Sequence, residues 1–301
     1  MRSPDMLDNL AARAAYAVFR MLGHFPLALL QSLGLFFGWV GWLAPGSYKL
    51  RAQENFSIAF PGLGRSMQRQ AMEQLLQMFF ELPYLWARQN DAQMDALVHC
   101  DEWPLFESLL AEGKGMILIT PHVGCFEVLG PLFSRKYKST VIFKEPKMRW
   151  LKVLINRVRV SSNLSMVPAT HGGVKALIKT LRRGNTVGML PDQVPNEGDG
   201  VYAPFFGRPA YTMTLVQKLQ HYSGAPVVTV GIERLGLGRG YRFHATRMPE
   251  AMSADPVIAA TQMNQALEDM IRKMPLQYLW GYNRYRKPRP AHPVDRPAAG
   301  Q

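Results

Sequence analysis

Short apolar runs and helical patterns alternate along the chain from residue 113 onward. Residues 116–120 are apolar up to the final threonine and follow a Gly-Lys-Gly turn, so they predict a buried strand. Five later segments share this character: 139–143, 165–168, 186–190, 225–232 and 241–247. The segments between and after them repeat apolar positions at helical spacing: 124–134, 148–158, 172–183, 212–222 and 255–273. This alternation predicts an α/β fold, a mixed central sheet flanked by helices.

The amino-terminal region carries a long uncharged segment. Residues 23–47 contain no Asp, Glu, Lys or Arg, and the core at 27–44 is almost wholly apolar. A helix needs about 20 mostly apolar residues to cross a bilayer, and Trp39 and Trp42 lie near one end, where interfacial aromatic side chains are expected. We therefore predict an N-terminal membrane-anchoring helix within residues 1–48, with a buried helix of a soluble core as the alternative. Pro26 leaves open a re-entrant or in-plane segment.

An excess of basic residues narrows the class of partner. The 301 residues carry a formal net charge of +13. Such a charge indicates an anionic partner: nucleic acid, an acidic membrane surface, or a phosphorylated or acidic protein substrate. The uncharged segment favours the membrane among these. The two cysteines, Cys100 and Cys125, form neither a disulfide framework nor a zinc pattern, which indicates ordinary thiols in a reducing compartment.

The candidate chemistry lies directly after the first predicted strand. His122 follows that strand in a loop, and Glu127 comes five residues later, in the first turns of a predicted helix. Sites in α/β sheets cluster outside the carboxyl ends of strands. A nearby carboxylate fixes the tautomer of a histidine and stabilises its protonated form, so that His122 can act as a general base toward a hydroxyl. The spacing alone is weak evidence, because it occurs by chance in many proteins.

Four further segments accompany this pair. They read Leu-Pro-Asp-Gln at 190–193, Ala-Pro-Phe-Phe-Gly at 203–207, Ala-Pro-Val-Val at 225–228, and Gln-Tyr-Leu-Trp at 277–280 followed by Arg284. A further stretch, 54–61, follows the uncharged segment. With these motifs in this order, the chain resembles the lysophospholipid acyltransferase superfamily and, within it, the lipid A late acyltransferases. The resemblance covers nearly the whole chain.

The resemblance implies a specific reaction. The family's donor is usually an acyl thioester on acyl carrier protein, and its acceptor is the hydroxyl of a primary acyl chain on a phosphorylated glucosamine disaccharide. The reaction needs neither metal nor cofactor, and no covalent acyl-enzyme is expected. His122 would deprotonate the acceptor hydroxyl, Glu127 would orient and charge-stabilise His122, and backbone N–H groups near Gly124 would receive the oxyanion. The implied location is the bacterial inner membrane, with the catalytic domain facing the cytoplasm.

Further residues are predicted to hold the acceptor. Asp192 and Gln193 follow a predicted strand and are expected to position the acceptor, with a turn and helix cap as the alternative. Phosphate groups need guanidinium or ammonium partners, and we expect Arg159 first, then Arg157 and Lys144, in this role. Lys144 departs from the arginine that many relatives carry, and a lysine cannot form the bidentate fork.

The resemblance also sets the domain boundaries and the competing hypotheses. We predict a helical anchor over 1–48, an acyltransferase α/β domain over 49–290, and a disordered tail over 291–301. The same chemistry on another acceptor, a phosphatidylinositol mannoside or an amino-acid lipid, remains open. A basic module that binds membranes or nucleic acid without catalysis explains the charge but not the motifs, and we expect no nucleic-acid partner.

Overall fold

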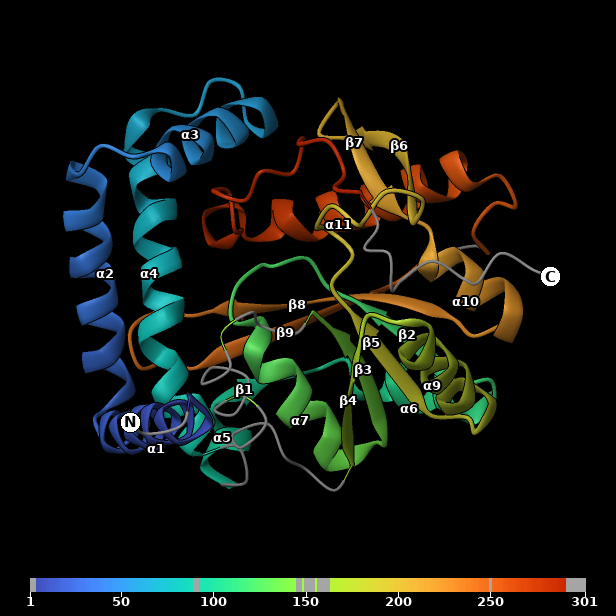
Figure 1. Cartoon of the computed structure of the whole chain (residues 1–301), viewed down its shortest axis with the longest axis horizontal. Helices are drawn as coiled ribbons and strands as arrows, with labels where there is room; N and C mark the ends of the chain where they lie inside the picture. The colour runs from blue at the N-terminus through green and yellow to red at the C-terminus, as the bar shows by residue number, and fades with distance from the viewer. Residues whose placement is uncertain are drawn as a thin grey trace.

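A seven-stranded sheet forms the centre of the computed structural model, which describes residues 4–88, 92–144, 148, 155, 163–248 and 251–290 (Figure 1). Its strand order is β1-β9-β8-β2-β5-β3-β4. The strands are β1 (Val98–His99), β2 (Met116–Ile119), β3 (Ser139–Phe143), β4 (Leu164–Pro168), β5 (Thr186–Met189), β8 (Val227–Arg234) and β9 (Tyr241–Arg247). Neighbours in this described sheet pair in parallel except β8 and β9, which are antiparallel.

Helices cover both faces of the sheet, as the alternating strand residues require. On β2, Ile117 and Ile119 face one core, whereas Met116 and Leu118 face the other. The first core packs against α9 (His171–Arg182), α10 (Leu215–Ser223) and α11 (Pro256–Lys273). The second packs against α6 (Trp103–Ala111) and α7 (Leu129–Lys136). The predicted α/β fold with a helix-flanked mixed sheet is thereby confirmed.

The amino-terminal helices form a separate layer at one end of the sheet (Figure 1). They are α1 (Pro4–Gly23), α2 (Leu27–Leu43), α3 (Ser47–Ala59) and α4 (Arg65–Ala87), and the short α5 (Ala92–Ala96) follows. α2 and α4 approach closely because glycines face the contact. A Cβ on Gly34 would lie 2.4 Å from the Gln77 Cα, and one on Gly38 would lie 2.4 Å from the Glu73 Cα.

The expected anchor differs from a single spanning helix. Within the described residues, no individual helix combines the length and apolar character needed to cross a bilayer. The end of α1 and the whole of α2 meet that test only together, and they are bent by 113° at the break between them. Pro26 directly precedes α2 at this break. The N-terminal membrane-anchoring helix therefore stays a prediction.

A β-hairpin is the main element that the sequence pattern does not predict. β6 (Gly200–Phe205) and β7 (Arg208–Met213) pair antiparallel, and Pro204 pairs with Pro209. Prolines within a strand argue against a central strand, which hides this hairpin. Its turn residues, Phe206 and Gly207, both have positive φ, as a two-residue type I′ turn requires. The first residues of the predicted helix 212–222 belong to this hairpin. The predicted helix 148–158 and tail 291–301 fall largely or wholly outside the described residues.

Candidate active site

Two neighbouring parallel strands, β2 and β5, deliver the central side chains of the site to one edge of the sheet. Ile119 at the end of β2 pairs with Met189 at the end of β5. His122 and Asp192 each follow three residues later. Because adjacent parallel strands end at the same edge, these equal intervals bring the two side chains to the same level.

The imidazole of His122 contacts the segment after β5 on two sides. Its Nδ1 lies 2.7 Å from Asp192 Oδ1, and its backbone N–H donates to Asp192 Oδ2 at 2.9 Å. Gln193 Nε2 lies 3.1 Å from His122 Nε2. An ionised carboxylate only accepts, so Nδ1 carries the proton and Nε2 presents its lone pair to the Gln193 amide. This is the tautomer that a histidine general base needs.

Asp192 holds its negative charge although its side chain is only 3% exposed. Burial by itself would raise the pKa of this carboxyl. The charge of His122, the hydrogen bonds from its ring and backbone, and the charge of Arg284 outweigh burial and hold the pKa of Asp192 below its usual value. A lasting negative charge beside Nδ1 stabilises an imidazolium, so the pair is suited to a histidine that takes up a proton at Nε2.

The loop that carries His122 is fastened to two other segments. The Leu279 N–H donates to the His122 carbonyl at 3.0 Å, and Gly124 N–H donates to the Gln277 carbonyl at 2.9 Å. Gly124 has φ of +60°, and a Cβ there would lie 1.7 Å from the Ile232 carbonyl oxygen. Only glycine fits this close approach.

These hydrogen bonds correct the expectation that backbone N–H groups near Gly124 bind the oxyanion. Gly124 N–H donates to Gln277, and Cys125 N–H donates to the Ile232 carbonyl at 2.8 Å. These N–H groups are therefore engaged inside the fold. The helix that was predicted to begin at 124 starts later, with a 3₁₀ turn, η1 (Phe126–Val128), that leads into α7.

Cys125 is a buried thiol beside the site. Burial, and then the charge of Glu81, raise the pKa of Cys125 well above its ordinary value. A thiol that stays protonated is a poor nucleophile. The geometry thus gives Cys125 a packing position next to the loop.

Glu127 lies on η1 and is half-buried. It lines a small hollow whose other walls are largely apolar: Leu85, Trp86, Met94, Val98, Val128, Pro131, Leu132 and Arg135. The contact at His122 Nδ1 that the structure records is with Asp192, a residue that the sequence assigned to acceptor binding. The pairing of His122 with Glu127 stays a prediction.

The predicted phosphate-binding residues are only partly described. Lys144 is exposed and directly follows β3, which pairs in parallel with β5, so it lies at the same edge of the sheet as His122. Arg157 and Arg159 lie outside the described residues. The structure therefore brings Lys144 to the same edge as His122, and the phosphate-binding roles of all three residues stay predictions.

A buried polar cluster behind Asp192 includes residues whose contacts the sequence did not reveal. Arg284 donates to the Tyr211 carbonyl at 2.6 Å and to Thr212 Oγ1 at 2.7 Å. Burial lowers the pKa of Arg284, and burial together with the charge of Asp192 raises the pKa of Tyr278 well above its ordinary value. Both residues lie in the motif near the chain end, which was the available signal. Within the described residues, no group of three or more His, Cys, Asp or Glu is arranged to hold a metal ion.

Comparisons with known proteins point to one family of acyltransferases. A family model described as bacterial lipid A biosynthesis acyltransferase matches residues 3–287. The lipid A biosynthesis palmitoleoyltransferase of Escherichia coli (strain K12) is 27% identical over 58% of this chain, and the match spans only 57% of that relative's length. The lipid A biosynthesis lauroyltransferase of the same organism is 25% identical over 82% of this chain and 83% of its own.

One solved structure is a distant neighbour. The 1-acyl-sn-glycerophosphate acyltransferase of Thermotoga maritima aligns with 82% of this chain and 94% of its own, at 14% identity and a TM-score of 0.34. This likeness is too weak to add to the family match.

Proposed function

The chain belongs to the bacterial lipid A biosynthesis acyltransferase family, and from this premise we propose that it transfers a fatty acyl chain to a hydroxyl of a lipid A precursor. The contact of His122 with a buried, ionised Asp192 at the sheet edge is the observation that carries the proposal. A hydroxyl is a weak nucleophile at neutral pH, and a positioned imidazole with a free lone pair provides the base it needs.

We propose a direct transfer without a covalent enzyme intermediate. His122 Nε2 takes the proton of the acceptor hydroxyl while that oxygen attacks the thioester carbonyl. The tetrahedral intermediate then expels the thiolate, which receives the proton back from the imidazolium. Asp192 holds the Nδ1 proton and stabilises the imidazolium throughout, and Glu127 remains the proposed second carboxylate of the site.

Gln193 is our proposed donor to the oxyanion. Its side-chain amide lies 3.1 Å from His122 Nε2, which places an N–H donor beside the reacting atoms. An incoming hydroxyl takes the place of the amide at the imidazole lone pair. The released N–H can then donate a hydrogen bond to the carbonyl oxygen as negative charge develops on it. The N–H groups of Gly124 and Cys125 cannot serve as these donors, because they donate to carbonyls within the fold.

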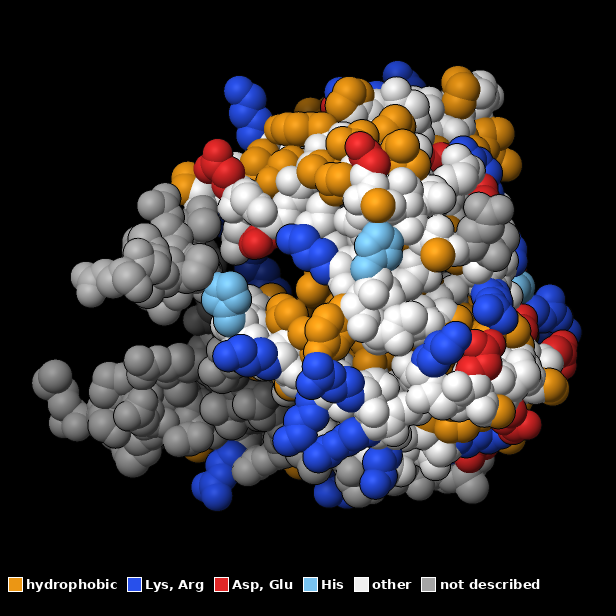
Figure 2. Space-filling view, turned by 90° about the vertical axis from the view of Figure 1, so that its right-hand side faces the viewer, with side chains coloured by type: hydrophobic (Ala, Val, Ile, Leu, Met, Phe, Trp, Pro, Cys, Tyr) orange, Lys and Arg blue, Asp and Glu red, His pale blue; other side chains and the backbone are white. Residues whose placement is uncertain are grey.

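We propose acyl carrier protein as the donor's carrier. Lys175, Lys179, Arg182 and Arg183 are exposed on α9 and at its carboxyl end. Figure 2 shows lysine and arginine side chains gathered in the lower part of the face that carries this helix. An acidic carrier protein complements such a surface, and charge complementarity speeds its encounter.

The acceptor's phosphate groups are assigned to Lys144, Arg157 and Arg159. Lys144 extends from the edge of the sheet that carries His122. An ammonium group and two guanidinium groups suit the phosphates of a disaccharide lipid.

We propose that α2 rests in the membrane surface with its outward face in the lipid. Its inward face packs on α4, whereas the outward face exposes Leu29, Leu33, Phe36, Phe37, Trp39, Val40 and Leu43. Such a face favours the interfacial region of a bilayer. The proposed location is the bacterial inner membrane, with the site facing the cytoplasm.

The test is product mass with the purified full-length protein in mixed micelles. Acyl carrier protein bearing a fatty acyl thioester is offered with a lipid A precursor, and mass spectrometry is expected to show the gain of one acyl chain. His122→Ala should lower turnover by about 10²–10⁴-fold while the protein stays folded. His99→Ala, which removes an exposed histidine on β1, is the matched control and should behave as the wild type.

Two outcomes would redirect the proposal. Acylation of a phosphatidylinositol mannoside or an amino-acid lipid in place of the lipid A precursor would move the assignment to another acceptor. A His122→Ala protein with wild-type turnover would contradict the assignment of the base.

A further inference from the structure

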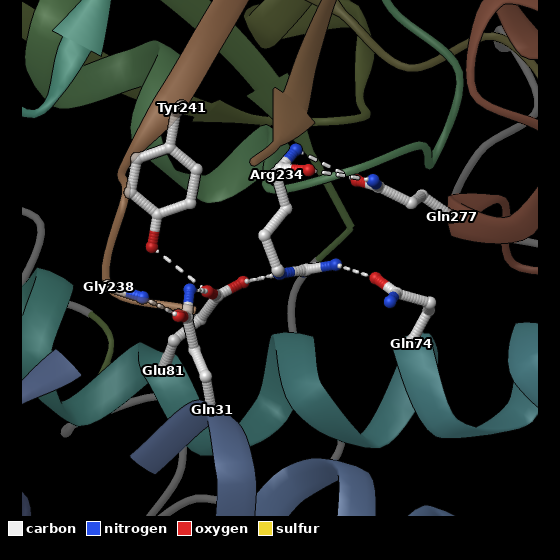
Figure 3. A network of polar contacts seen from close by, with 7 residues as sticks. All are labelled: Gln31, Gln74, Glu81, Arg234, Gly238, Tyr241 and Gln277. Atoms are coloured by element: carbon white, nitrogen blue, oxygen red, sulfur yellow. Dashed lines mark hydrogen bonds and ion pairs between the residues drawn. The ribbon is translucent and has the colours of Figure 1, made fainter. Parts of the chain in front are cut away.

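A buried ion pair joins the amino-terminal helices to the carboxyl end of β8 (Figure 3). Glu81 on α4 and Arg234 at the end of β8 are 0% and 1% exposed. Arg234 Nε donates to Glu81 Oε1 at 2.8 Å, and Nη2 donates to the same oxygen. Arg234 Nη1 donates to Gln74 Oε1 at 2.9 Å. The pair is thus sealed from water and held by several directional bonds.

The second carboxylate oxygen collects the remaining elements. Glu81 Oε2 accepts from Tyr241 OH and from Gln31 Nε2, each at 2.9 Å. Gln31 Oε1 in turn accepts from the Gly238 N–H at 2.8 Å. The network therefore fixes α2, α4, β8, β9 and the β8–β9 turn relative to one another. Buried charges are tolerated only when paired and hydrogen-bonded, and this arrangement provides both.

The same network reaches the loop that carries His122 by two routes. Gln277 forms a pair of hydrogen bonds with the Arg234 backbone, as acceptor at 2.8 Å and as donor at 3.0 Å, and its own carbonyl accepts from Gly124 N–H at 2.9 Å. The Cys125 N–H donates to the carbonyl of Ile232, two residues before Arg234 on β8, at 2.8 Å. Both contacts fall within three residues of His122.

We propose that Arg234, through Glu81 and Gln277, is a positioning residue that sets the placement of His122 against Asp192. The inference rests on the proposed function for the reaction that is positioned. Two apolar side chains in place of Glu81 and Arg234 would fill the same volume but would let α4 and β8 shift relative to each other. The hydrogen bonds of Arg234 and Gln277 are directional, and a single arrangement satisfies all of them. The amino-terminal helices thereby take part in positioning the catalytic base.

The test removes both charges together, because a single substitution leaves a buried ion without its partner. Glu81→Gln with Arg234→Met keeps an acceptor for Tyr241 and Gln31 and leaves no buried charge. We expect a melting temperature close to that of the wild type. We also expect kcat to fall about 10- to 100-fold, with KM for both substrates almost unchanged, since a small misplacement of a reacting group has this effect.

A spectroscopic readout separates positioning from stability and from the proposed function. The titration of the His122 ring is followed by NMR of ¹³C-histidine-labelled protein, with His122→Ala to assign the signal. We expect its midpoint to shift away from the wild-type value in the double variant. This titration needs no turnover, so a wild type that transfers no acyl chain defeats the proposed function while the positioning is still tested.

Gln277→Met provides a second variant that introduces no buried charge. It removes the two bonds to the Arg234 backbone, and Gln265→Met at an exposed site on α11 is its control. We expect the shifted His122 titration and lower kcat in Gln277→Met only. Wild-type kcat in both the double variant and Gln277→Met would overturn the proposal. So would a loss of kcat that leaves the His122 titration unchanged.

Discussion

Asp192 and Glu81 are both buried carboxylates with a hydrogen-bonded basic partner, yet the partners differ in kind. Asp192 faces His122, whose side chain is 16% exposed and whose proton can come and go. Glu81 faces Arg234, which is 1% exposed and permanently charged. The first pair sits at the open edge of the sheet, and the second lies sealed between α4 and β8.

The difference shows how one fold divides two tasks between similar groups. A pair whose partner titrates can store and return a proton during a reaction. A pair whose partner never titrates can only hold geometry. Burial of a carboxylate therefore does not mark a reacting site by itself; the exposure and the chemistry of its partner decide.

We expect the largest effect when the charge of Asp192 is removed. Asp192→Asn should lower kcat by about 10³-fold or more, because the amide no longer favours the Nδ1 proton and the imidazolium. Steady-state acyl transfer measures this effect, and circular dichroism checks the fold. Glu127→Gln is the matched variant. It should lower turnover strongly, but by a smaller factor than Asp192→Asn does. A larger loss for Glu127→Gln than for Asp192→Asn would return the role of ring partner to Glu127.

Gln193 contacts the other ring nitrogen of His122, Nε2. Gln193→Leu should lower kcat by about 10²-fold, the usual loss when one oxyanion donor is removed, with little change in KM. Gln265→Leu on the exposed face of α11 controls for the loss of an amide. A rise in KM without a fall in kcat would instead support the acceptor-binding role predicted from sequence.

The packing of α2 against α4, the helix that carries Glu81, is tested by placing a larger side chain at their contact. Gly34→Ala places a Cβ 2.4 Å from the Gln77 Cα, so the helices must move apart. We expect the free energy of unfolding to fall by about 1–3 kcal/mol. Gly41→Ala on the same helix meets nothing within 4 Å and should be neutral or slightly stabilising. Equal melting curves for the two variants would show that α2 is not held against α4 as described.

Much of the fold could be predicted from the sequence, because local patterns determine where its strands and helices form. The apolar run of β2 and the cap at Asp255 are confirmed, and the Asp255 carboxylate accepts from the Val257 and Ile258 N–H groups as a helix cap should. The hairpin of β6 and β7 was missed because its prolines contradict strand propensity, and its turn depends on positive φ at Phe206.

The site was harder to predict than the fold, since it depends on strand order. His122 and Asp192 are 70 residues apart, and only the pairing of β2 with β5 makes them neighbours. The sequence indicated each residue through its motif, but it gave no sign that Asp192 contacts His122. The contact between Arg234 and Glu81, on β8 and α4, had no local signal at all.

The equal intervals from Ile119 to His122 and from Met189 to Asp192 set how far each side chain lies beyond the end of its strand. Lengthening one by a single residue would put the imidazole and the carboxylate out of phase along the edge, while lengthening both together would keep them in step. Related chains with an insertion at one interval should therefore carry a compensating insertion at the other, or have lost this contact altogether.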